Sequence, residues 1–332
     1  DKLGIHASPT CVMSFGENYG ATGWLIGAEN TGMAAMFTMM NNARLNVGIQ
    51  GVGLAEQATQ IAMSYAADRV QGRAPDAQRG ENTPVAIASH PDVRNMLMTM
   101  RALTDAARAI CYENGVFHDL AHFAGDDKAK AFNELLTPIS KAFSTDIANE
   151  VSSLGVQIHG GMGFVEETGI AQFVRDAKIL PIYEGTNGIQ AIDLINRKLP
   201  LANGAIISEY LDQIEETINQ CSGEETLKEL SSALKNGLAD LRVATDFMLT
   251  HPDKLDRLYG ATDYLTLFGL VAGGHYLARG ALGTMKTNEM THKVKTASFF
   301  MDRLLPRTKG HLASILSTKE HLDNEEIFHI VG

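Results

Sequence analysis

The residues that could do chemistry gather in one stretch, residues 157–190, which reads QIHGGMGFVEETGIAQFVRDAKILPIYEGTNGIQ. It joins a double-glycine loop, a short amphipathic segment and one carboxylate, Glu184, at a turn that opens a helix. Free backbone N–H groups at such a turn point at a substrate oxygen, so a carboxylate there is a candidate general base. Alternatively, Glu184 is a solvated surface residue and Thr186 is only the N-cap of the helix.

The order of these residues resembles a known signature. RDAKILPIYEGTNGIQ, preceded by QIHGGMGF, is similar to the C-terminal signature of the acyl-CoA dehydrogenase family. In that family the Glu of the YEGT turn removes an α-proton from an acyl-CoA thioester while the β-hydride passes to FAD. The resemblance implies that Glu184 is the catalytic base, that Tyr183 and Gly185 contact the substrate, and that FAD is the cofactor.

Arg44 is a second candidate, near the start of a helix predicted over residues 44–69. A buried cation at a helix N-terminus gains nothing from the helix dipole, so it needs an anionic partner. By resemblance, Arg44 is the Arg that approaches the acyl-CoA, with Asn41 where an Asp is more usual. Some family members carry their catalytic Glu at the position of Ala43, which leaves Glu184 as the candidate base of the family type.

The resemblance also implies a set of flavin contacts. Arg69 is similar to the Arg that reaches across a subunit interface to the diphosphate, and C-terminal helix capping is its alternative role. Residues 69–73 (RVQGR) are one residue shorter than the usual RxxFG and lack its aromatic residue, so Gln71 matches only weakly. Gly188 stands where the family often has a longer polar residue. The implied contacts to FAD, some of them from a partner subunit, are Arg69, Gln157, Gly160, Gly161, Thr186 and Asn187.

The elements that must position these residues are mainly helical. Apolar residues at helical spacing predict a bundle of the acyl-CoA dehydrogenase C-terminal type. Gly48, Gly51 and Gly53 lack the order and the preceding strand of a dinucleotide fingerprint, so we expect them to serve close helix packing. The predicted helices span residues 44–69, 92–123 with Asp92 as cap, 126–153 with a bend at Thr137-Pro138, 206–221, 224–249, 253–285 and 289–316.

Three domains are expected. Residues 10–15 and 24–27 alternate as a β-hairpin, which resembles the last part of the family's middle β-domain and needs a partner surface. The domains are then 1–30 (end of the β-domain), 31–199 (helical bundle) and 200–332 (helical extension). The extension resembles the larger bacterial subgroup that includes 3-methylthiopropionyl-CoA dehydrogenases. Because the chain begins at Asp1 and has no TEPxxGSD-like flavin segment, we expect it to be the C-terminal part of a longer protein and inactive alone.

Composition argues against several function classes. The net charge is −11, from 39 acidic and 28 basic residues, which disfavours an extended nucleic-acid footprint. The basic segment 279–309 is expected to be a solvated helix face. No apolar run approaches the ~20 residues of a membrane span. Widely spaced cysteines indicate neither a disulfide framework nor a zinc site and favour the cytoplasm. His118 and His122 stand at i, i+4 without a third ligand, so no metal site is predicted.

The family resemblance implies an acyl-CoA substrate, an electron-transfer flavoprotein or similar acceptor, a homodimer or homotetramer, and a role in fatty acid metabolism. Two alternatives belong to other classes. One is a non-catalytic helical assembly module that keeps the fold without the flavin. The other is a nucleic-acid-binding flavoprotein relative with a basic C-terminal surface, although acidic residues outnumber basic ones from residue 201 onward.

Overall fold

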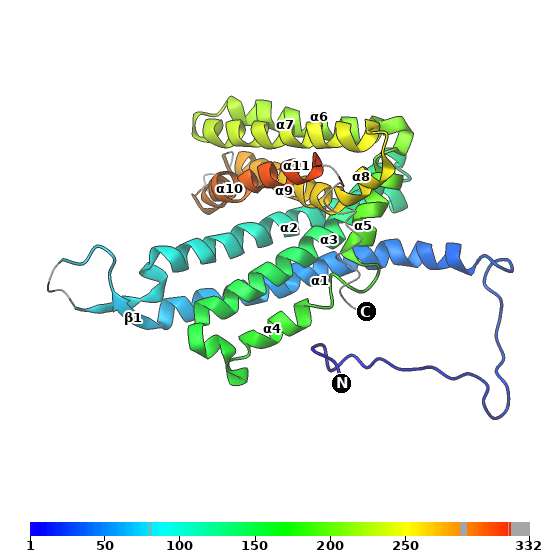
Figure 1. Cartoon of the computed structure of the whole chain (residues 1–332), viewed down its shortest axis with the longest axis horizontal. Helices are drawn as coiled ribbons and strands as arrows, with labels where there is room; N and C mark the ends of the chain where they lie inside the picture. The colour runs from blue at the N-terminus through cyan, green and yellow to red at the C-terminus, as the bar shows by residue number, and fades with distance from the viewer. Residues whose placement is uncertain (79, 81, 286–290, 318, 320–332) are drawn as a thin grey trace.

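The chain folds into stacked helical layers in the computed structural model, which describes residues 1–78, 80, 82–285, 291–317 and 319 (Figure 1). Three long helices form one layer: α1 (Gly32–Asp68), α2 (Pro91–Phe123) and α3 (Asp127–His159). The short helices α4 (Ile170–Ala177) and α5 (Asn187–Asp193) lie beside them. The remaining helices extend this stack: α9 (Ala261–Met285) and α10 (Thr291–Arg303) pack on α2, and α6 (Ala205–Ser222), α7 (Lys228–Thr250), α8 (Lys254–Tyr259) and α11 (Thr308–Ile315) pack against α9. The predicted mainly-α fold is confirmed.

Local sequence explains where the long helices begin and end. Asp126 caps α3 by accepting hydrogen bonds from the backbone N–H groups of Lys128 and Ala129, at 2.9 and 3.0 Å. The helix runs on as one element through Pro138 and ends at His159, with Gly160 as its C-cap at a φ of 59°. The prediction that Asp92 caps α2 is wrong. Its N-cap is His90, because Pro91 lacks an N–H and suits the first helical position.

Glycines allow α1 to pack closely against α3. A Cβ added at Gly48 would lie 2.5 Å from the carbonyl oxygen of Ser140, and one at Gly51 would lie 2.7 Å from that of Ser144. Side chains of any size there would separate the two helices. The predicted packing role therefore holds for both residues, whereas a Cβ at Gly53 would meet nothing within 4 Å.

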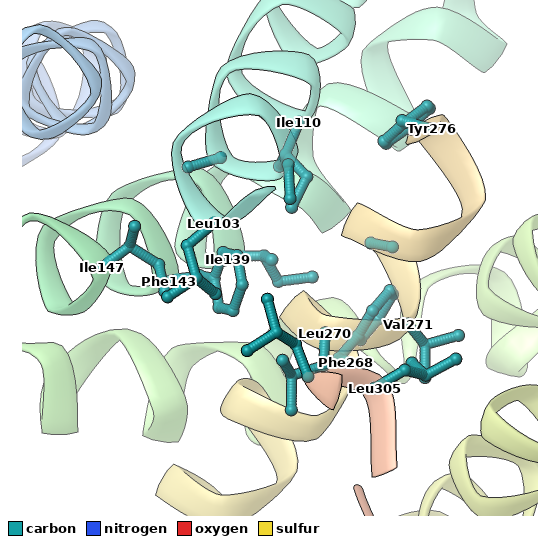
Figure 2. Close-up of a cluster of buried hydrophobic side chains, with 14 of the residues drawn as sticks. Leu103, Ile110, Ile139, Phe143, Ile147, Phe268, Leu270, Val271, Tyr276 and Leu305 are labelled. Carbon is teal, nitrogen blue, oxygen red and sulfur yellow. The ribbon is translucent and has the colours of Figure 1, made fainter. Parts of the chain in front are cut away.

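One apolar core joins the first helices to the C-terminal ones. Figure 2 shows side chains of α2, α3 and α9 converging, and the labelled residues are Leu103, Ile110, Ile139, Phe143, Ile147, Phe268, Leu270, Val271, Tyr276 and Leu305. The chain breaks its helical path at residues 201–204, where Ala202 and Asn203 have positive φ. The proposed domain boundary near residue 200 thus coincides with a turn, while the core continues across it.

The predicted N-terminal hairpin is wrong. Residues 10–31 are exposed and contain no strand, because a lone strand pair is marginal in water and no sheet covers this segment among the described residues. The strands lie elsewhere: β1 (Val70–Arg73) pairs antiparallel with β2 (Pro84–Ala86) around a polar loop. Among the described helices, none combines the length and apolar character that crossing a bilayer requires.

Candidate active site

Glu184 lies in a tight turn between α4 and α5. Its φ is 55° and that of Gly185 is 85°, so two consecutive residues adopt the left-handed conformation. For a non-glycine residue this conformation costs about 1–2 kcal/mol, and such strain concentrates at functional sites. Thr186 is the N-cap of α5 and accepts a hydrogen bond from the Ile189 N–H at 3.3 Å. The turn therefore contains both the Thr186 cap of α5 and Glu184, which is half-buried and has a strained backbone.

A buried lysine that the sequence analysis missed lies against this turn. Lys141 of α3 has no exposed surface, and its Nζ donates to the Gly185 carbonyl oxygen and to Asn187 Oδ1, each at 2.9 Å. The signal in the sequence is that Lys141 is the only charged residue within residues 135–145. Burial lowers the pKa of Lys141 to about 8, with Asp146 and Glu184 acting in the opposite direction.

Asn187 fastens the start of α5 to α3. Its side-chain nitrogen donates to the Ala142 carbonyl oxygen at 3.2 Å and to Asp146 Oδ1 at 2.8 Å. Burial raises the pKa of Asp146. Because both polar atoms of the Asn187 amide have partners on α3, this side chain holds the turn in place.

Arg44 has the expected anionic partner, but the prediction that it lies near the start of its helix is wrong, because α1 begins at Gly32. Only 3% of Arg44 is exposed, and its Nη1 lies 3.2 Å from Asp193 Oδ2. Arg197 also binds Asp193, from the next turn of the same helical segment. Two fully buried atoms near the turn, Arg44 Nε and Gln190 Oε1, have no hydrogen-bond partner among the described residues.

The groups of Arg44 and Gln190 meet at Gly185. A Cβ at Gly185 would lie 2.9 Å from Gln190 Nε2 and 3.7 Å from Arg44 Nη2. Tyr183, the residue before Glu184, bonds through its hydroxyl to the Gln50 side chain of α1. Burial, and next the charge of Glu184, raises the pKa of Tyr183. The structure thus brings together Glu184, Gly185 and Arg44, with Tyr183 beside them.

Arg69, Gly160 and Gly161 line a cleft of about 600 Å³ at the C-terminal end of α1, together with Tyr65 and His90. A Cβ at either glycine would meet nothing within 4 Å, so their backbone faces open space instead of a packed neighbour. Arg69 is the C-cap residue of α1, and its exposed side chain donates to Gln71 Oε1 at 3.3 Å.

The residues predicted to hold the cofactor fall into two separate groups. Gln157 lies exposed on the last turn of α3 and does not line the cleft. Thr186 and Asn187 lie at the Glu184 turn. Because α1 rises 1.5 Å per residue, Arg44 and Arg69 are about 37 Å apart along the helix.

Other candidates show no comparable arrangement. The rings of His118 and His122 stack at 6.2 Å, and no group of three or more potential metal ligands occurs among the described residues. Basic residues of the C-terminal segment pair with acidic ones, since Arg279 binds Glu113 and Arg307 binds Glu150. These two arginines are therefore neutralised by ion pairs and do not form an unpaired basic surface.

The sequence of this chain is similar to two protein families and to several known proteins. Residues 30–199 match the family described as "Acyl-CoA dehydrogenase, C-terminal domain", and residues 210–323 match "Acetyl-CoA dehydrogenase C-terminal like". The chain is 41% identical to 3-methylmercaptopropionyl-CoA dehydrogenase of Ruegeria pomeroyi, over 97% of this chain and 56% of the relative. It is 32% identical to a butyryl-CoA dehydrogenase of Syntrophomonas wolfei, over 95% of this chain and 52% of the relative.

Solved structures share the fold. ACDH-11 of Caenorhabditis elegans, in complex with C11-CoA, superposes with a TM-score of 0.72 at 20% identity, covering 92% of this chain and 50% of that one. An acyl-CoA dehydrogenase of Bacillus anthracis complexed with FAD gives 0.67 at 22% identity, covering 86% and 50%. The chain therefore spans about half the length of the relatives it matches.

Proposed function

Because this chain belongs to the acyl-CoA dehydrogenase family, we propose that it is the part of an acyl-CoA dehydrogenase that supplies the catalytic base. The proposed reaction is FAD-dependent α,β-dehydrogenation of an acyl-CoA thioester. Since the chain spans about half the length of its relatives, we assign the reaction to the whole protein and expect this chain alone to be inactive. The observation that carries the proposal is the Glu184 carboxylate on a left-handed turn braced from the protein interior.

Glu184 acts as the general base in this proposal. Its carboxylate takes the α-proton of the thioester, and the electron pair of that C–H bond moves toward the carbonyl oxygen. The backbone N–H of Glu184 donates to this oxygen, and Tyr183 and Gly185 contact the acyl group. Arg44 lies on the substrate side of the turn, where its Nε has no partner among the described residues and is available to a ligand oxygen.

The cleft at Arg69 fits the diphosphate and adenosine of FAD. It offers a guanidinium, from Arg69, beside two glycines whose backbone is open, which is a donor set suited to an anionic dinucleotide. Gln157 flanks this cleft. Thr186 and Asn187, at the Glu184 turn, are the other proposed contacts to FAD. When bound, FAD supplies the hydride acceptor that no side chain provides.

The separation of the two groups supports a homodimer or homotetramer. At about 37 Å along α1, the distance from Arg44 to Arg69 exceeds what one dinucleotide bridges. The cleft at Arg69 would then serve the flavin of a neighbouring subunit. Electrons would leave through an electron-transfer flavoprotein or a similar acceptor.

Replacing Glu184 by Gln in the full-length protein tests the assignment of the base. We expect flavin absorbance to be retained and anaerobic flavin reduction by acyl-CoA to slow by at least about 10³-fold. Suitable substrates are butyryl-CoA and 3-methylmercaptopropionyl-CoA, the compounds named in two relatives. Glu167→Gln, which changes an exposed carboxylate in the segment before α4, is the control. Unchanged reduction by the Glu184→Gln protein would refute the base, and a wild-type protein that binds no flavin would refute the dehydrogenase.

A further inference from the structure

Lys141 is a fully buried lysine, and its hydrogen bonds alone do not explain why a charged residue stands at this position. Its side chain has no exposed surface, and it forms no ion pair within the described part of the chain. An ammonium group without a contacting carboxylate is costly to bury, so residues of this kind are rare unless they serve a purpose. The charged groups that act on it are Asp146 on its own helix, Arg44 from α1 and Glu184 from the turn.

The two acceptors that Lys141 contacts also have other donors. The Gly185 carbonyl oxygen accepts from Gln190 Nε2 at 3.3 Å, and Asn187 Oδ1 accepts from Thr145 Oγ1 at 3.3 Å. With an apolar side chain at position 141, the Gly185 oxygen would keep its bond from Gln190, and the Asn187 oxygen would share the single Thr145 hydroxyl proton with the Ala142 carbonyl oxygen, 3.0 Å from that hydroxyl. Satisfying buried acceptors does not account for the lysine.

The position of the ammonium group explains the presence of a lysine at residue 141. The Gly185 carbonyl belongs to the second of the two left-handed residues, so holding this oxygen restricts rotation of the turn at the residue that follows Glu184. The bond to Asn187 fixes the turn at the first residue of α5. Among the described residues, Lys141 is thus tied to the strained segment at Gly185 and to the start of α5 at Asn187, both on the C-terminal side of Glu184.

We propose that Lys141 is a positioning residue for the general base: its ammonium group clamps the Gly185 carbonyl and so fixes the direction of the Glu184 carboxylate. This inference rests on the proposed function. The clamp acts through the backbone and has no contact with the reacting atoms. The buried ammonium group lowers the stability of the fold but holds Glu184 in one position, a compromise that is common at strained active sites.

Lys141→Met tests the clamp, with Lys130→Met on the exposed side of the same helix as the matched control. Three quantities are measured: the melting temperature, hydrogen exchange of the amides of residues 183–189, and kcat and KM of the full-length protein. We expect Lys141→Met to melt at or above the wild-type temperature while exchange in 183–189 accelerates about 10-fold or more. We expect kcat to fall about 100-fold, with KM changing much less, because a small misplacement of a catalytic group is costly.

A purely structural lysine would behave differently. In that case Lys141→Met would lower the melting temperature and accelerate exchange throughout the helices, which would overturn the proposal. Unchanged exchange at 183–189 would also overturn it. If Lys141→Met does not fold, Lys141→Gln, which keeps a donor without the charge, is measured in the same way.

Failure of the clamp and failure of the dehydrogenase are distinguishable. Local acceleration of exchange in this chain, with no flavin reduction by the wild-type full-length protein, would support the clamp and refute the reaction. Normal reduction by both the wild-type and the Lys141→Met proteins would support the reaction and refute the clamp.

Discussion

Gly51 and Gly53 provide a matched pair for testing how closely α1 and α3 must pack. Both lie in the interior of α1 with φ values outside the left-handed region, so alanine fits either backbone. A Cβ at Gly51 would lie 2.7 Å from the Ser144 carbonyl oxygen and 3.2 Å from the Thr145 nitrogen. These are backbone atoms that no side-chain rotation can move, so one helix must shift.

The expected effects of the two substitutions have opposite signs. Overpacking of this kind costs about 1–3 kcal/mol, so Gly51→Ala should lower the free energy of unfolding by that amount. Gly53→Ala meets nothing and gains helix propensity, so it should raise the free energy of unfolding by about 0.5–1 kcal/mol. Urea denaturation of the chain, followed by circular dichroism, measures both. Equal changes in the two variants would refute the packing argument, because propensity alone treats the two glycines alike.

Two further predictions concern buried charge. Asp193→Asn leaves Arg44 buried without its anionic partner and should destabilise the chain by about 3–5 kcal/mol in urea denaturation. Asp212→Asn, which breaks the exposed contact with Arg242, should cost less than about 1 kcal/mol, and similar losses would contradict the buried pair. The pKa of Lys141 is about 8 when folded and about 10.4 when unfolded, so the unfolded chain holds this proton more tightly. Its contribution therefore destabilises the fold below pH 8, and the free energy of unfolding should rise by about 1–3 kcal/mol between pH 8 and 10.4. Urea denaturation against pH checks this, and a rise of the same size in Lys141→Met would show that other groups cause it.

Sequence reasoning worked best where a structure depends on neighbours along the chain. The Thr186 cap of α5 follows from a side chain that bonds within a few residues, and α2 ends at Phe123 as predicted. It failed for the strands, because the segments that pair were not those with the clearest alternation. β1 and β2 are short, and a register irregularity interrupts their pairing.

The sequence by itself determined the helical composition, the turn at Glu184 and the family, because each is written in contiguous residues with a characteristic order. Only the tertiary structure decided which charges surround that turn. Asp193 is 149 positions from Arg44, and Lys141 reaches the turn from the middle of an otherwise uncharged helical segment. The spacing of residues along a helix says which face they share, but the packing of α1, α3 and α5 sets which faces meet.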